Sequence, residues 1–164
     1  MRYYESAFPV FASAEGVSYE IFLSGCRGYC DGCHSPHTHD FNSGIDLDDG
    51  VFFSELIMDI QEKYDAGQLD NVVIMGGEPL DHTDAELADL IDAVRIACPK
   101  VKIWMYTHFE ADEVKNRPEI FNRLDWIKCG KFDKSKFSEA GFKSELTGVT
   151  LATSNQYFIK GGYK

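Results

Sequence analysis

The sequence of 164 residues contains no run of eighteen apolar residues, which a membrane-spanning helix would need. It has no basic run either: the lysines are scattered, with only a modest excess from Lys128 to Lys143, and the net charge is −11. Proteins that bind nucleic acid need clustered Lys and Arg to neutralise phosphates. We therefore expect no membrane partner and no nucleic-acid partner.

Targeting and linker signals are missing as well. Acidic and polar residues interrupt the first sixteen residues, which therefore do not form the apolar segment of a secretory signal peptide. We expect a cytoplasmic protein. There is no internal repeat, low-complexity tract or linker, and the length is sufficient to bury a core, so we expect a single domain over residues 1–164.

Cysteine is unevenly placed along the chain. The chain has five cysteines, and because a reducing cytosol keeps thiols reduced, we expect no disulfide bonds among them. Three of them, Cys26, Cys30 and Cys33, lie within eight residues, which points to a metal site. Cys98 and Cys129 stand alone, and we expect both to pack in or near the core rather than to serve as ligands.

Periodic hydrophobic segments indicate an alternation of strands and helices. We expect strands at 17–23, 71–75, 101–106 and 124–129, helices at 51–66, from Thr83 to Pro99 and near Pro118, and a further strand or extended segment at 149–159. Such alternation predicts parallel strands with right-handed crossovers. Because a complete eight-unit barrel takes about 250 residues, we expect an α/β fold with a partial (open) parallel β/α barrel.

The loop after the first of these strands carries the spacing C-x3-C-x2-C at Cys26, Cys30 and Cys33. Thiolates bind soft metals, and iron–sulfur clusters are held mostly by cysteine. Three protein ligands would leave one iron of a cubane cluster open to a substrate or cofactor. The spacing favours a [4Fe–4S] cluster, but zinc remains an alternative, with His34, His37 or His39 as the fourth ligand.

A second segment, Gly76-Gly77-Glu78-Pro79, follows the strand at 71–75. In α/β proteins, ligands bind at the carboxyl ends of parallel strands. Glycines allow a backbone to approach a ligand closely, and the Glu78 carboxylate is able to accept hydrogen bonds from an ammonium group. An ordinary turn from strand to helix is the alternative for this segment taken alone. Beside a cluster with an open iron, it suits a cofactor with an amino-acid head.

These features resemble the radical S-adenosylmethionine enzymes and, more narrowly, the activating proteins of anaerobic (class III) ribonucleoside-triphosphate reductases. The similar stretches are FLSGCRGYCDGCHSPHTHDFNSG at 22–44, IMGGEPL at 74–80, WMYTHF at 104–109 and TSNQ at 153–156. Their order and spacing cover nearly the whole chain. The resemblance implies a barrel of the radical S-adenosylmethionine type.

The resemblance also implies a mechanism and partners. A [4Fe–4S] cluster on Cys26, Cys30 and Cys33 would bind S-adenosyl-L-methionine, whose reductive cleavage leads to a glycyl radical on the reductase. The electron would come from a donor such as reduced flavodoxin. The residues implied to contact the cofactor are Gly32, Cys33, His34, Gly76, Gly77 and Glu78.

Three departures from the family pattern weaken the identification of the protein substrate. Ser35 stands where Asn is frequent, His108 where Gly is usual, and Tyr157 where Arg is common. Two other functions remain open. One is a small-molecule radical enzyme such as a 7-carboxy-7-deazaguanine synthase, which shares the three-cysteine pattern, although this chain has little length for an additional pocket. The other is a non-catalytic zinc-binding module.

Overall fold

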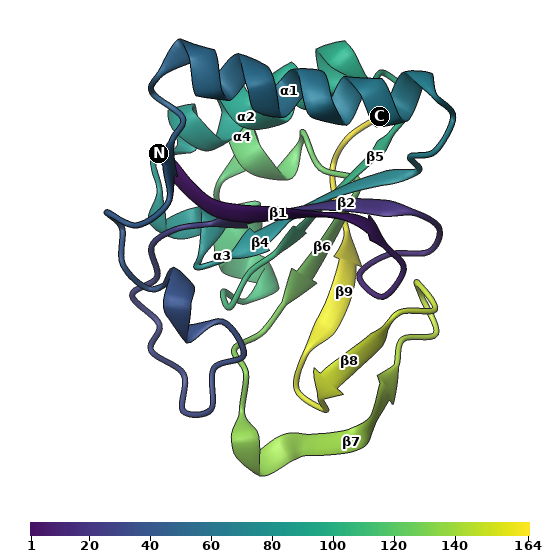
Figure 1. Ribbon diagram of the computed structural model, residues 1–164. Helices are drawn as coiled ribbons and strands as arrows, with labels where there is room; N and C mark the ends of the chain where they lie inside the picture. Colours follow the sequence, from purple (N-terminus) through teal and green to yellow (C-terminus); the bar gives the residue numbers. More distant parts are fainter.

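The computed structural model describes residues 1–164, which form strands, α-helices and three 3₁₀ turns (Figure 1). The strands are β1 Arg2–Val10, β2 Ser18–Leu23, β3 Ile45–Asp46, β4 Asn71–Gly76, β5 Lys102–Tyr106, β6 Trp126–Cys129, β7 Phe137–Lys143, β8 Thr150–Thr153 and β9 Tyr157–Lys160. The helices are α1 Gly50–Asp65, α2 Asp84–Ala97, α3 Ala111–Lys115 and α4 Pro118–Phe121. The 3₁₀ turns are η1 Pro36–Thr38, η2 Pro79–Asp81 and η3 Lys134–Lys136.

Local sequence signals explain where the two long helices begin. The Asp49 carboxylate accepts a hydrogen bond from Val51 N at the start of α1. At α2 the expected capping box is present, because Thr83 and Glu86 bond to each other's backbone amides. These contacts satisfy amides that have no partner inside the helix. The predicted helices at 51–66, at 83–99 and near Pro118 are confirmed.

The main sheet has seven strands in the order β3-β1-β2-β4-β5-β6-β9. The pairs β2–β4, β4–β5 and β5–β6 are parallel. The pairs β1–β2, β1–β3 and β6–β9 are antiparallel. The predicted partial parallel β/α barrel is therefore wrong: the sheet is mixed and open, with antiparallel strands at both edges.

The error arose at the edges, where no helix separates the strands. Residues 11–17 join β1 to β2, and a connection this short allows only an antiparallel pair, whereas a parallel pair needs a crossover of a dozen or more residues. At the other edge, β9 follows the β7–β8 hairpin and runs back along β6. The sequence reasoning gave no strand for β1 or β7.

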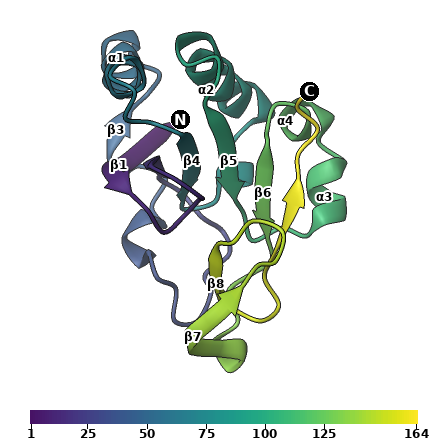
Figure 2. The ribbon, with the colours of Figure 1, turned by 90° about the vertical axis from the view of Figure 1, so that its right-hand side faces the viewer.

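The two faces of the sheet are covered differently (Figures 1 and 2). On one face, side chains of all four helices pack with the strands in the larger hydrophobic core, which includes Ile60, Leu90, Val114 and Ile120. On the other face, the β7–β8 hairpin packs through Leu151 in a smaller core. None of the helices combines the length and apolar character that crossing a bilayer requires.

Candidate functional site

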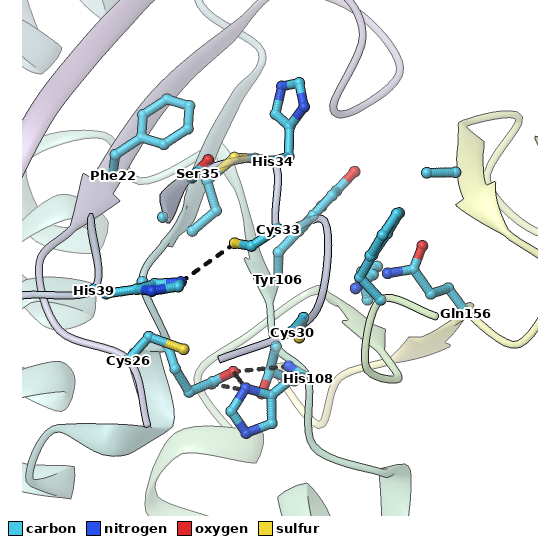
Figure 3. A pocket seen from close by; sticks show the side chains of 18 of the residues that line it. Phe22, Cys26, Cys30, Cys33, His34, Ser35, His39, Tyr106, His108 and Gln156 are labelled. Atoms are coloured by element: carbon cyan, nitrogen blue, oxygen red, sulfur yellow. Dashed lines mark hydrogen bonds and ion pairs between the residues drawn. The ribbon is translucent and has the colours of Figure 1, made fainter. Parts of the chain in front are cut away.

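A cavity of about 530 Å³ lies on the hairpin side of the sheet. One wall is the cysteine loop, and a second consists of residues near the carboxyl ends of the parallel strands, among them Met75, Tyr106 and Lys128. Strand β8 supplies a third wall through Thr150, Leu151 and Ala152. Figure 3 shows that the labelled side chains surround one open space. The site lies where parallel strands usually present ligands.

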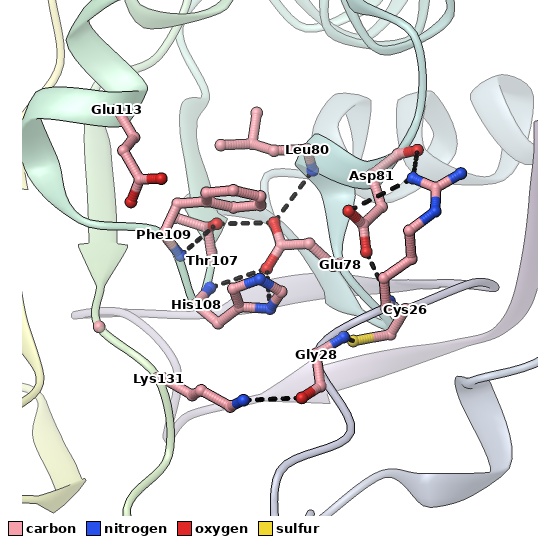
Figure 4. A network of polar contacts seen from close by, with 12 residues as sticks. Cys26, Gly28, Glu78, Leu80, Asp81, Thr107, His108, Phe109, Glu113 and Lys131 are labelled. Carbon is pink, nitrogen blue, oxygen red and sulfur yellow. Dashed lines mark hydrogen bonds and ion pairs between the residues drawn. The ribbon is translucent and has the colours of Figure 1, made fainter.

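Backbone hydrogen bonds hold the cysteine loop in place. Gly25 N donates to Thr38 O at 2.6 Å, and Cys26 N donates to His39 O at 3.2 Å, so the two ends of the loop are tied together. Lys131 Nζ donates to Gly28 O at 2.7 Å from the segment after β6 (Figure 4). The loop is thus fastened from both sides, which limits the positions that its thiols can take.

Cys26, Cys30 and Cys33 all line the cavity (Figure 3). The pKa of the Cys33 thiol is raised, first by burial and then by the charges of Cys30 and Cys26, against a lowering contact with Ser35. Gly28 N donates to Cys26 Sγ at 3.2 Å, and His39 Nε2 lies 3.4 Å from Cys33 Sγ. Hydrogen bonds to sulfur suit thiolates that bind an iron–sulfur cluster, because they help to set its potential. Three soft donors around one cavity fit such a cluster.

A zinc site needs four donors at about 2.0–2.3 Å around one ion. No group of three His, Cys, Asp or Glu side chains in the chain is arranged to hold a single metal ion. Of the three loop histidines, His39 contacts Cys33, His37 lies 3.5 Å from Glu5, and the His34 ring points away from the thiols in Figure 3.

Gly76 and Gly77 bring the end of β4 against the start of the cysteine loop. Gly77 N donates to Leu23 O at 2.8 Å, and Glu78 N donates to Gly25 O at 2.7 Å. A Cβ atom on Gly77 would overlap Gly25 O, and one on Gly76 would lie 2.6 Å from Leu23 N. Gly76 also has a φ of 107°. The glycine pair is therefore required by this close approach of two backbones, and both residues line the cavity.

The Glu78 carboxylate is almost completely buried, with 1% of the residue exposed, and is surrounded by donors (Figure 4). Oε1 accepts from Leu80 N at 3.0 Å and from Thr107 Oγ1 at 2.6 Å. Oε2 accepts from His108 N at 2.7 Å and lies 3.0 Å from His108 Nδ1. A carboxylate has about four acceptor sites, and partners within the chain use all four. Glu78 joins the ends of β4 and β5 at the cavity wall.

His108 lies between this carboxylate and the cysteine loop. Contacts with Cys26 and then with Glu78 raise the pKa of its imidazole to about 10, against a lowering by burial. A Cβ atom on Gly28 would lie 2.9 Å from the His108 ring, so the glycine makes room for it. The side chain at this departure from the family pattern thus forms part of the cavity wall.

The structure also places two buried acidic or basic residues in the cavity that sequence reasoning did not assign to the site. Lys128 is 9% exposed, donates from Nζ to Gly130 O at 2.9 Å, and has a pKa lowered to about 8, chiefly by burial. Glu20 is 8% exposed, and burial raises the pKa of its carboxyl. A lysine inside the apolar strand Trp126–Cys129 was a signal that could have identified the first of them.

The predicted site residues are gathered here with one exception. Those that line the cavity are Cys26, Cys30, Cys33, His34, Gly76, Gly77 and Glu78. Gly32 does not line it: it turns the loop with a φ of 73° and faces Phe132 and Lys134. Cys98 and Cys129 are fully buried in the larger core, as expected, and do not line the cavity.

The sequence also matches a family of known proteins. The model of the 4Fe-4S single cluster domain matches residues 12–148. A Haemophilus influenzae protein named anaerobic ribonucleoside-triphosphate reductase-activating protein is 30% identical over 122 residues, covering 73% of this chain and 77% of that protein. Proteins with the same name from Enterobacteria phage T4 and Escherichia coli are 23% and 26% identical, covering 80% and 79% of this chain and 82% and 84% of theirs.

Proposed function

This chain belongs to the 4Fe-4S single cluster domain family and to the family of anaerobic ribonucleoside-triphosphate reductase-activating proteins, and from this membership we propose that it is a radical S-adenosylmethionine activase. Its substrates would be S-adenosyl-L-methionine and an anaerobic ribonucleoside-triphosphate reductase. One electron enters from a donor such as reduced flavodoxin. The products are methionine, 5′-deoxyadenosine and a reductase whose glycine has lost one hydrogen atom to the 5′-deoxyadenosyl group.

One observation carries the proposal: three cysteines in C-x3-C-x2-C spacing and the Gly76–Glu78 segment face one cavity in a chain that matches a 4Fe-4S domain. Cys26, Cys30 and Cys33 would hold the cluster. When bound, a [4Fe–4S] cluster with three cysteine ligands supplies one electron and an open iron at which the cofactor's amino-acid head can bind.

The chain's own residues would position the cluster and the cofactor. Gly28 N and His39 would stabilise the thiolates of Cys26 and Cys33. Because all four acceptor sites of Glu78 are used by the chain, we assign the carboxylate a positioning role: it fixes Thr107 and His108 at the wall. The cofactor's amino group would then be held by backbone atoms of Gly76 and Gly77, beside His34.

The test is an anaerobic assay of the reconstituted protein with S-adenosyl-L-methionine, a reductant and an anaerobic ribonucleoside-triphosphate reductase. We expect 5′-deoxyadenosine by chromatography and a glycyl radical on the reductase by electron paramagnetic resonance. Cys30→Ala should abolish both signals, whereas Cys98→Ala, a change in the core, should retain them. Wild-type cleavage rates in Cys30→Ala would overturn the proposal, and turnover of a pterin without a protein partner would favour a small-molecule enzyme.

A further inference from the structure

Strand β8 presents an edge, rather than a face, to the cavity. Three successive residues, Thr150, Leu151 and Ala152, line it. Because successive side chains on a strand point to opposite faces, a cavity that touches all three must meet the strand along its backbone. Leu151 is 6% exposed and packs in the smaller core with Val73 and Trp104, so the strand is anchored on the sheet.

That edge has unpaired backbone groups. Strand β8 pairs only with β7, and the two form a separate two-stranded sheet. Ser144 N donates to Val149 O, so the alternation of an antiparallel pair turns the N–H and C=O groups of Thr150 away from β7, whereas Ala152 lies at the register shift between Phe137 and Phe142. No backbone hydrogen bond from outside the hairpin reaches Thr150. A free strand edge of this kind is a template for another extended chain.

The cavity also contains a carboxylate without a cation. Glu20 projects from β2, is 8% exposed and takes part in no ion pair. The Ser13 hydroxyl lies close to it but does not complete a hydrogen bond of good geometry. Lys128, the buried cation of the same cavity, donates to Gly130 O instead. A buried carboxylate is costly unless it is paired, so the site is suited to a ligand that brings a positive charge.

We infer that the cavity binds an extended segment of a protein substrate, added as a strand to the free edge of β8, with a basic side chain of that segment paired to Glu20. The inference rests on the proposed function, in which a glycine of the reductase has to reach the cysteine loop. An added strand beside β8 would carry its residues along a cavity that Cys26, Cys30 and Cys33 also line. A nucleoside cofactor has no backbone that could match such an edge.

The test measures binding of a labelled peptide by fluorescence anisotropy under anaerobic conditions. The peptide contains the radical-bearing glycine of an anaerobic ribonucleoside-triphosphate reductase and its flanking residues, and the protein is the full chain, reconstituted with iron and sulfide. A series of peptides carries one N-methyl group each, which removes a single backbone donor. We expect a loss of about tenfold in affinity at alternate residues, because only every second amide faces β8.

Variants of the protein test the contacts that β8 and Glu20 would make with the peptide. Thr150→Pro removes a donor from the free edge without removing a β7–β8 hydrogen bond, and Thr150→Val keeps the donor as a matched control. We expect about tenfold weaker binding for the proline variant alone. Glu20→Gln and replacement of the peptide's basic residue by norleucine should each weaken binding, and together should cost no more than either one.

Three results would overturn the inference: no binding of the peptide to the wild-type protein, an N-methyl profile without period two, or additive effects of the Glu20 and peptide changes. The N-methyl series needs no protein variant, so it decides the matter even where Thr150→Pro does not fold. The proposed function is judged separately, by 5′-deoxyadenosine formation in the wild-type protein. Cofactor cleavage with a flat N-methyl profile would therefore refute the binding mode alone.

Discussion

The same parallel strands have two faces with different chemistry. On β2, Tyr19, Ile21 and Leu23 enter the larger core under the helices, whereas Glu20 and Phe22 face the cavity. The other strands repeat the pattern. Their helix-side residues include Ile74, Ile103 and Ile127, and their cavity-side residues include Met75, Tyr106 and Lys128.

On the cavity side, charged residues of the strands are buried rather than solvated. An antiparallel sheet with one wet face also alternates apolar and polar residues, so alternation alone does not reveal a cavity. Here Glu20 and Lys128 are 8% and 9% exposed. Burial of a charged group is unfavourable unless the group is paired. Such residues therefore indicate a functional site, where the fold tolerates a loss of stability.

The two faces should differ most in how much a truncated side chain lowers the free energy of unfolding. Ile74 is fully buried under the helices, and its neighbour Met75 lines the cavity. We expect Ile74→Ala to lower the free energy of unfolding by about 2–5 kcal/mol and Met75→Ala to lower it by less than half as much. Urea unfolding of the metal-free protein measures both. An equal loss in Met75→Ala would show that the cavity side packs as tightly as the core.

Removing the buried cation of Lys128 should raise the free energy of unfolding, by less than Ile74→Ala lowers it. The pKa of Lys128 is about 8 in the folded protein, below the ordinary 10.5, so folding must bury an ammonium at neutral pH. This cost is complete below pH 8 and disappears as the pH rises to 10.5. We expect Lys128→Met to be more stable than the wild type at pH 7, on the order of 2 kcal/mol, with the difference shrinking by pH 10.

Thermal and urea unfolding at both pH values check this prediction, with Lys131→Met as the control. Lys131 is exposed, so its replacement should not produce the same dependence on pH. A Lys128→Met variant that is less stable than the wild type at pH 7 would mean that the contact with Gly130 O outweighs the cost of burial.

The smallest expected effect concerns the hydrogen bonds around Glu78. Thr107→Val removes the hydroxyl that donates to Glu78 Oε1 and accepts from Phe109 N. We expect a loss of about 1–2 kcal/mol in the free energy of unfolding, because a buried carboxylate loses a donor. Thr107→Ser retains the hydroxyl and should lose less. Equal losses in the two variants would assign the effect to packing of the methyl group.

The sequence predicted much of the local structure because its signals were local. The capping box at Thr83, Pro99 after α2 and the apolar run at 71–75 each depend on neighbouring residues, and each gave the correct element. The barrel was wrong because strand direction at the edges depends on connections, and β1 was not recognised as a strand.

The candidate site was predictable to the extent that it lies in short motifs. The thiols and the glycine pair are adjacent in sequence, and the fold brings both groups to one cavity. Lys128 and Glu20 could not be assigned from the chain, because their role depends on which face of a strand meets the cavity. The use of both Glu78 oxygens by Thr107 and His108 likewise depends on the pairing of β4 with β5.

The most direct test of the central claim is iron and sulfide analysis of the anaerobically reconstituted protein and of its five single Cys→Ala variants. The claim is that Cys26, Cys30 and Cys33 hold one [4Fe–4S] cluster. It predicts about four iron and four sulfide per wild-type chain, a loss of the cluster in each of the three loop variants, and retention in Cys98→Ala and Cys129→Ala. Stoichiometric zinc without sulfide, or a cluster that survives the loop variants, would contradict it.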